Sequence, residues 1–165
     1  GVPGVSQHEV QPGGTFTYDF LVPDAGTFWY HPHVRSAKQV GDGLYGAFIV
    51  EDPNEPRFGD ELVAVLSDMS VASDGSLRPP DLGGDIATLF GREGDLILVN
   101  GRWQPSLGAR SGRPQRWRLV NAARSRYFEV ALAGHSFIRI GGDGGLLPAP
   151  VASERFMISP GERAD

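Results

Sequence analysis

The chain has 165 residues, a mass of 17.7 kDa and a formal net charge of −5, which argues against a nucleic-acid or anionic-membrane partner. No apolar run approaches the roughly 20 residues that span a bilayer. Cysteine is absent, which excludes a disulfide framework, a thiolate metal site and a cysteine nucleophile within these residues. Glycine (23) and proline (13) are abundant, and this composition favours short strands joined by turns over long helices.

The first 54 residues contain three segments that we predict to be strands. Thr15–Val22 alternates aromatic and polar residues, Thr27–His33 is β-prone and aromatic, and Leu44–Val50 is apolar. The stretch 51–56 after them contains two prolines among acidic residues and asparagine, as a linker does. We therefore predict one unit over residues 1–54 and a second over 55–165.

The second unit continues as short apolar runs separated by turn residues. No segment of 12 or more residues shows a helical period, so the predicted fold class is all-β, a sandwich or a barrel. Asn100-Gly101 is a strong turn dipeptide after one of these runs. The predicted strands are Leu62–Leu66, Leu96–Val99, Arg116–Val120, Phe128–Leu132, Phe137–Ile140 and Phe156–Ser159.

His31 and His33 are the candidate metal ligands. On a strand, residues i and i+2 project from the same face, which places the two imidazoles together with Cα atoms roughly 6.5 to 7 Å apart. Neutral imidazole suits copper, zinc, iron and nickel, and Trp29 shares the predicted face. The spacing alone is equally compatible with two hydrogen-bonded surface histidines. Of the other histidines, His135 fits a turn and His8 an irregular polar stretch, and we assign neither to a metal.

Three other patterns are interpreted as structural. Gly41–Gly46 satisfies G-x-G-x-x-G, but the segment after it is too short and too β-like for a dinucleotide-binding helix, so these glycines indicate a tight turn and close backbone approach. Residues 141–145 lack the lysine of a phosphate loop. The alternating Arg116 and Arg118 fit the solvated face of a strand rather than a nucleic-acid surface.

Several segments, in order, resemble the multicopper oxidases, the laccase-like copper enzymes. They are Gly1–Gln7, Pro12–Tyr18, Gly26–His33, Gly43–Asp52, Leu98–Gly101, Trp117–Ala122, Asp143–Pro148 and Pro160–Arg163. The resemblance implies a cupredoxin-like Greek-key β-sandwich. Residues 1–54 correspond to the later half of a first domain, and 55–165 to a middle domain without a copper site and lacking its last strand.

The resemblance also implies a role for the histidine pair. His31 and His33 would each hold one copper of the coupled, type 3 pair in a trinuclear cluster, with no further catalytic residue in this chain. Such enzymes oxidise phenols, aromatic amines or metal ions one electron at a time at a type 1 copper and reduce dioxygen to water. The family is generally secreted or periplasmic.

Other family elements have no counterpart in these residues. An upstream His-Trp-His-Gly motif with an acidic residue, and a downstream domain with further His-x-His motifs and a His-Cys-His, would lie outside the chain, and without cysteine it cannot hold the type 1 copper. We therefore expect an internal segment, inactive alone, whose partners are the remaining oxidase polypeptide, dioxygen and the reductant.

Two alternatives remain at this stage. One is a cupredoxin-like scaffold or binding protein that has lost copper. The other is a cupin, whose His-x-His also sits on a strand; that motif would want a glutamate a few residues on, and 34–38 contains none.

Missing neighbour strands have a measurable consequence. A partial sandwich leaves strand edges and apolar faces uncovered, so the isolated chain should self-associate or be poorly soluble. Size-exclusion chromatography tests this expectation, and a well-behaved monomer of about 18 kDa would count against it.

Overall fold

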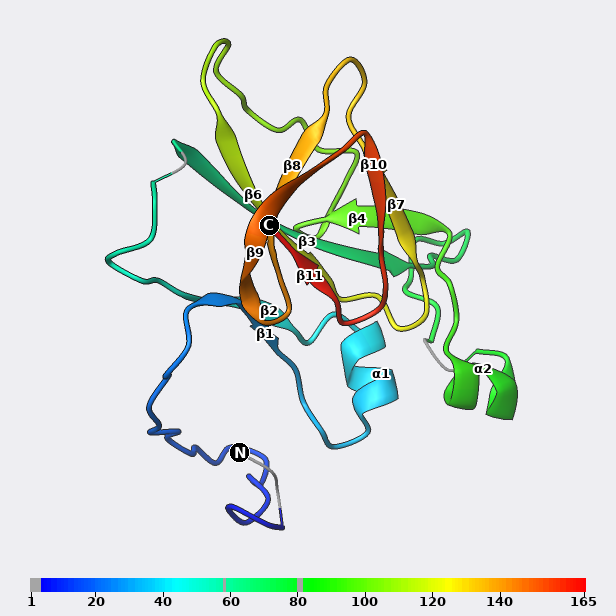
Figure 1. Ribbon diagram of the computed structural model, residues 1–165. Helices are drawn as coiled ribbons and strands as arrows, with labels where there is room; N and C mark the ends of the chain where they lie inside the picture. The colour runs from blue at the N-terminus through cyan, green and yellow to red at the C-terminus, as the bar shows by residue number, and fades with distance from the viewer. Residues whose placement is uncertain (1–3, 58, 80–81) are drawn as a thin grey trace.

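The computed structural model describes residues 4–57, 59–79 and 82–165, and within them the chain is built from short strands with two short helices (Figure 1). In chain order the elements are β1 (Gly26–Tyr30), α1 (Ser36–Gly41), β2 (Gly46–Val50), β3 (Asp60–Met69), α2 (Gly84–Phe90), β4 (Leu96–Val99), β5 (Arg102–Trp103), β6 (Gln115–Asn121), β7 (Phe128–Ala131), β8 (Phe137–Gly142), β9 (Gly145–Ser153), β10 (Arg155–Ile158) and β11 (Arg163–Ala164).

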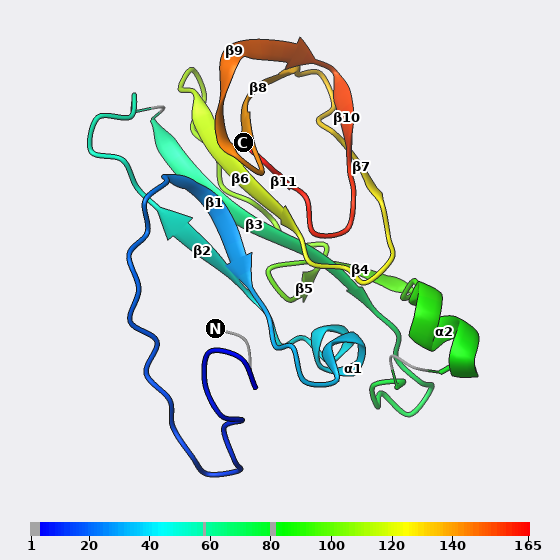
Figure 2. The same ribbon diagram turned by 60° about the horizontal axis from the view of Figure 1, so that its bottom comes forward.

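The largest sheet has the order β11-β6-β3-β4-β5, in which only the β3–β6 pair is parallel. The remaining strands form three antiparallel pairs, β1–β2, β7–β10 and β8–β9. Figure 2 shows β7–β10 and β8–β9 gathered on one side of β3 and β6, with β1–β2 on the other. This layered arrangement confirms the predicted all-β sandwich.

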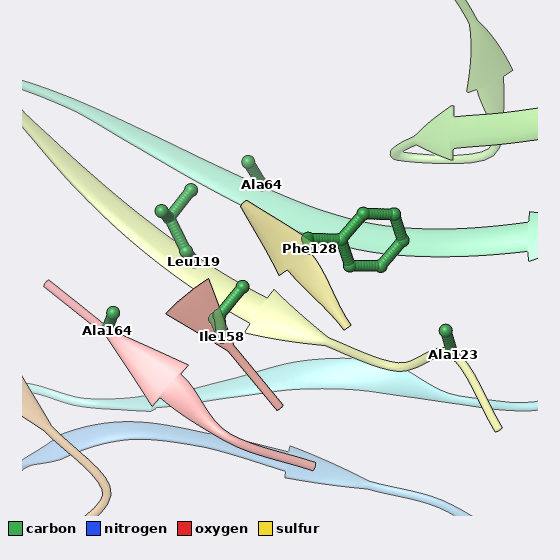
Figure 3. Close-up of a cluster of buried hydrophobic side chains, with 6 residues drawn as sticks. All are labelled: Ala64, Leu119, Ala123, Phe128, Ile158 and Ala164. Atoms are coloured by element: carbon green, nitrogen blue, oxygen red, sulfur yellow. The ribbon is translucent and has the colours of Figure 1, made fainter. Parts of the chain in front are cut away.

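The main apolar core lies between the large sheet and the β7–β10 pair. Ile158 from β10 and Phe128 from β7 face Leu119 from β6 and Ala64 from β3, and Ala123 and Ala164 complete the cluster (Figure 3). Ile158 is fully buried, and burial of such a side chain contributes about 1.5–3 kcal/mol. The core therefore belongs to the second unit and fixes its two layers.

Several predicted strands are confirmed. Leu96–Val99 is β4, and the turn after it has positive φ at Asn100 (51°) and Gly101 (71°), which the Asn-Gly pair tolerates and which closes the β4–β5 hairpin. The segments predicted at Leu62–Leu66, Arg116–Val120, Phe128–Leu132, Phe137–Ile140 and Phe156–Ser159 each overlap an observed strand. β5, β9 and β11 have no counterpart among the predicted strands, and β9 contains Pro148 and Pro150, which are unusual inside a strand.

The strand predicted at Thr15–Val22 is wrong. These residues are exposed and have no strand partner among the described residues, and an extended segment without a neighbour cannot form a ladder. The aromatic side chains of this segment still make local contacts, and Tyr18 OH accepts a hydrogen bond from Gln7 Nε2 at 2.9 Å. Phe16 packs edge-on against Tyr18, and the Phe20 ring lies 6.2 Å from that of Phe48 in β2.

The interpretation of Arg116 and Arg118 as a solvated face is also wrong. Both are buried, at 6% and 2% exposure, because carboxylates lie beside them. Arg116 donates to both carboxylate oxygens of Glu55, at 2.8 and 3.0 Å, and to Asp165 at 2.6 Å. Arg118 lies 3.0 Å from Glu61 and 3.4 Å from Asp165. The alternation predicted the strand correctly, but not which side of it faces solvent.

This buried arginine–carboxylate network joins the two parts of the chain. Glu55 lies in the predicted linker, residues 51–56. Thr27 of β1 donates from Oγ1 to Asp165 at 2.6 Å and accepts from Arg118 at 3.1 Å. The hydrogen bonds from Arg116 hold the pKa of Glu55 below its usual range. Burial disfavours the charged form of Arg116, but its bonds to Glu55 and Asp165 outweigh that effect and raise its pKa.

Glu55→Gln should lower the free energy of unfolding at pH 7 by about 3 kcal/mol, because it leaves a buried guanidinium with one charged partner fewer. Since the folded-state pKa of Glu55 is lowered, its contribution is present above the usual glutamate pKa of about 4.3 and is lost as the pH falls through the folded value. Denaturant unfolding between pH 3 and 7 measures both effects, and the variant should show a flatter pH profile.

Glu129→Gln is the matched control. Glu129 pairs with Arg155 at 3.5 Å with both side chains more than half exposed, and the expected change is under about 1 kcal/mol. Equal losses for the two variants would contradict the structural importance of the network.

Candidate metal centre

The two candidate ligands lie directly after the last residue of β1. The β1–β2 ladder ends at the pair Tyr30–Gly46, and Pro32, which has no N–H to donate, lies between the histidines. The predicted strand Thr27–His33 is therefore confirmed only through Tyr30. Because pairing stops there, His31 and His33 occupy an unpaired stretch that leads into α1.

The rings of His31 and His33 lie side by side. Their centroids are 4.9 Å apart and their planes differ by 17°, a stacked arrangement. The Trp29 indole lies 4.4 Å from the His31 ring, which confirms that Trp29 shares this side of the segment. His31 Nδ1 is 3.3 Å from the carbonyl oxygen of Pro32. The i, i+2 spacing thus brings the two imidazoles together as predicted, even though the ladder has ended.

His31 borders an open cavity of about 340 Å³ between the two units. His31 is half-buried and His33 is exposed, so solvent can reach both imidazole rings. The lining residues are Trp29, His31, Ser36, Ala37, Val40, Leu89, Phe90, Gly91, Ala123, Arg124, Pro160 and Gly161. Most of these lining residues are apolar.

The other two histidines do not join this pair in a ligand group. His135 is exposed in the β7–β8 turn, with Nδ1 3.0 Å from the carbonyl of Ala133, as the turn prediction required. His8 is exposed in the segment before β1. Among residues 4–57, 59–79 and 82–165 there is no group of three or more His, Cys, Asp or Glu side chains placed to hold a metal ion.

The glycines of Gly41–Gly46 act as turn and packing residues. Gly43 has φ +96° in the turn after α1, and a Cβ on Gly46 would overlap the Tyr30 ring. The interpretation of this motif as a tight turn with close backbone approach is therefore confirmed. The aromatic ring lying over Gly46 fixes the end of β1 immediately before His31.

Tyr45, in the same motif, adjoins a second, water-sized cavity. Burial raises its pKa, and Ser67 and Asp68 of β3 line the same space. This cavity and the larger one share Val40, Ala123 and Arg124 as walls.

Sequence reasoning missed the residues that hold β1 in place. Thr27, Arg118 and Asp165 come from distant parts of the chain, and their contacts depend on the packing of β1 against β6 and β11. The one signal in the sequence was the pair of alternating arginines, because buried arginines need carboxylate partners.

The donor chemistry of the pair fits copper. Two imidazoles with an approach open to solvent match the ligands that copper accepts, and no thiolate competes. Stable metal sites need three or four protein ligands, so this pair amounts to part of a site.

Comparison with known proteins identifies the family. Residues 1–55 and residues 61–165 each match a sequence profile of the family described as "Multicopper oxidase". The chain belongs to the multicopper oxidase family. Among the segments that resemble this family, only residues 1–3 lie outside the residues that the structure describes.

Individual relatives agree with this assignment. Laccase-2 of Cryptococcus neoformans is 34% identical over 99% of the chain, which covers 31% of that protein. A multicopper oxidase from Pseudomonas thermotolerans has a crystal structure that superposes with a TM-score of 0.91 at 37% identity, covering all of this chain and 40% of the other. The cell division protein FtsP of Salmonella typhimurium is 34% identical over 86% of the chain and 31% of that protein. The chain thus spans about a third of the curated relatives it matches.

No helix in the described part of this multicopper oxidase chain is long and apolar enough to cross a membrane.

Proposed function

We propose that this chain is a segment of a laccase-like multicopper oxidase and that His31 and His33 are ligands of its trinuclear copper cluster. The observation that carries the proposal is the stacked imidazole pair at the end of β1, in a chain that matches the family along nearly its whole length. Each histidine would hold one copper of the type 3 pair. The type 1 copper would be held elsewhere, because its thiolate ligand requires a cysteine.

The proposed overall reaction is the one-electron oxidation of a small reductant, a phenol, an aromatic amine or a metal ion, coupled to reduction of dioxygen to water. When bound, copper supplies the one-electron redox steps. The residues of this chain supply two neutral imidazole donors, hold their rings together and border an apolar cavity beside them. The chain alone would be inactive, because it supplies an incomplete ligand set.

We also propose the domain assignment that accompanies this function. Residues 1–54 would be the later half of a first cupredoxin domain, which holds the ligands, and 55–165 a second domain without a copper site. Further ligands would come from the remaining oxidase polypeptide, from an upstream His-x-His and a third cupredoxin domain. A secreted or periplasmic location would follow from membership of the family.

A copper-free scaffold is the second candidate. It is favoured by the relative FtsP, whose name describes a cell division protein rather than an oxidase. The two imidazoles, with ring centroids 4.9 Å apart, argue for the metal-binding role, because a copper-free scaffold would not need a histidine pair. A cupin does not fit, since the family matched over both parts of the chain is multicopper oxidase.

His31→Ala and His33→Ala should each abolish oxidase activity in the intact enzyme and lower its copper content, because each removes one cluster ligand. His135→Ala, at an exposed turn histidine, should leave activity and copper content unchanged. Metal analysis with steady-state oxygen consumption measures both. Full activity in both ligand variants would favour the scaffold.

The chain alone should bind Cu²⁺ weakly, because two imidazoles make only part of a site. In a titration followed by NMR, paramagnetic broadening should begin at His31 and His33, ahead of His8 and His135. Broadening that begins at His8 or His135 would contradict the assignment.

A further inference from the structure

The side of β1 that leads to the histidines contacts Arg118 and the Gly161–Asp165 segment. Thr27, Trp29, His31 and His33 follow one another at intervals of two, so they project from the same side of this extended segment. β1 contacts β11 and β6 in the second unit. The histidine pair therefore lies just beyond one end of β1, and the residues at the other end of β1 are held by contacts with the second unit.

The first clamp is at Thr27, which is 1% exposed. Its hydroxyl donates to Asp165 at 2.6 Å and accepts from Arg118 at 3.1 Å, while its carbonyl accepts from Arg163 Nε at 3.2 Å. All of these partners belong to the second unit. A threonine with a hydroxyl bonded in both directions has one allowed position, so the start of β1 is fixed relative to β6 and β11.

The second clamp is at Trp29. A Cβ on Gly161 would lie 3.7 Å from Trp29 Cζ2, which places the indole directly over the turn before β11. The same indole also contacts the His31 ring, with the two ring centroids 4.4 Å apart. The turn is itself held, because Glu162 accepts from the backbone N–H of Ser159 at 2.8 Å and Arg163 donates to the Gly161 carbonyl at 2.8 Å.

We propose that Thr27 and Trp29 are positioning residues for the copper ligands, through which the Gly161–Asp165 segment of the second unit sets the placement of His31. This inference rests on the proposed function. It means that the second unit, although it would hold no copper itself, positions a copper ligand of the first unit. Thr27 fixes the first residues of β1 against the second unit. Trp29 contacts both the turn at Gly161 and the His31 ring, so the position of that turn sets the position of the ring.

The alternative is that these contacts only stabilise the fold. The two roles separate in a measurement of metal affinity on folded protein, because loss of stability alone does not change the affinity of molecules that remain folded. Partners that orient metal-bound histidines typically change metal affinity by 10–100-fold when removed.

The experiment uses the full-length oxidase and the variants Thr27→Val and Thr27→Ser. Valine keeps the shape and removes the hydroxyl, whereas serine keeps the hydroxyl. Copper affinity is measured by competition with a chelator, and the free energy of unfolding is measured separately on the copper-free protein. Thr27→Val should weaken copper binding at least about tenfold and lower kcat, with KM for the reductant unchanged. Thr27→Ser should keep most of the wild-type copper affinity and most of the wild-type kcat.

Thr17→Val is the matched control, since Thr17 is exposed in the segment before β1. Trp29→Phe, compared with Trp103→Phe at an exposed indole in β5, carries the same test if Thr27→Val fails to fold. It should weaken copper binding while the Trp103 variant does not.

The outcomes are distinguishable. Copper affinity of Thr27→Val and Trp29→Phe equal to that of their controls, with His31→Ala still losing copper, would overturn this inference alone. Wild-type copper affinity in His31→Ala would overturn the proposed function.

Discussion

The structure depends on two buried arginines that must meet carboxylates from other parts of the chain. Arg116 and Arg118 lie at 6% and 2% exposure in β6, and Glu55 and Asp165 supply the facing charges. Taking such charges out of water is expensive, and the cost is offset only when the geometry satisfies every partner. The network brings Glu55 of the linker, Asp165 after β11 and Thr27 of β1 to the same two arginines. That arrangement fixes β1 against the second unit.

The candidate metal centre follows from this constraint. β1 ends at Tyr30 with its ring over Gly46, Pro32 ends the ladder, and the two imidazoles project together beyond it. The structure thus shows a stacked pair of imidazoles with His31 beside a mostly apolar cavity, and we propose that this pair is the part of a metal site that the chain supplies. An all-imidazole environment suits copper, and the family assignment points to the same metal.

The differences between prediction and structure have a common physical origin. Alternation in Thr15–Val22 and in β6 described strand propensity, but pairing and burial depend on neighbours. The first segment has no partner strand among the described residues, so it stays exposed, and β6 is covered on the side that its arginines occupy. β9 forms despite Pro148 and Pro150, since its antiparallel pairing with β8 skips those positions.

The sequence by itself determined the all-β class, the Asn100-Gly101 hairpin, the adjacent placement of His31 and His33 and the family resemblance, because these depend on local periodicity, turn chemistry and motif spacing. Only the tertiary structure decided that Arg116 and Arg118 are buried, that Thr27 forms a hydrogen bond with Asp165, 138 positions along the chain, and that Trp29 lies close to both Gly161 and His31. Contacts between segments so far apart are set by how the layers pack, and no local pattern encodes which distant carboxylate will face a given arginine.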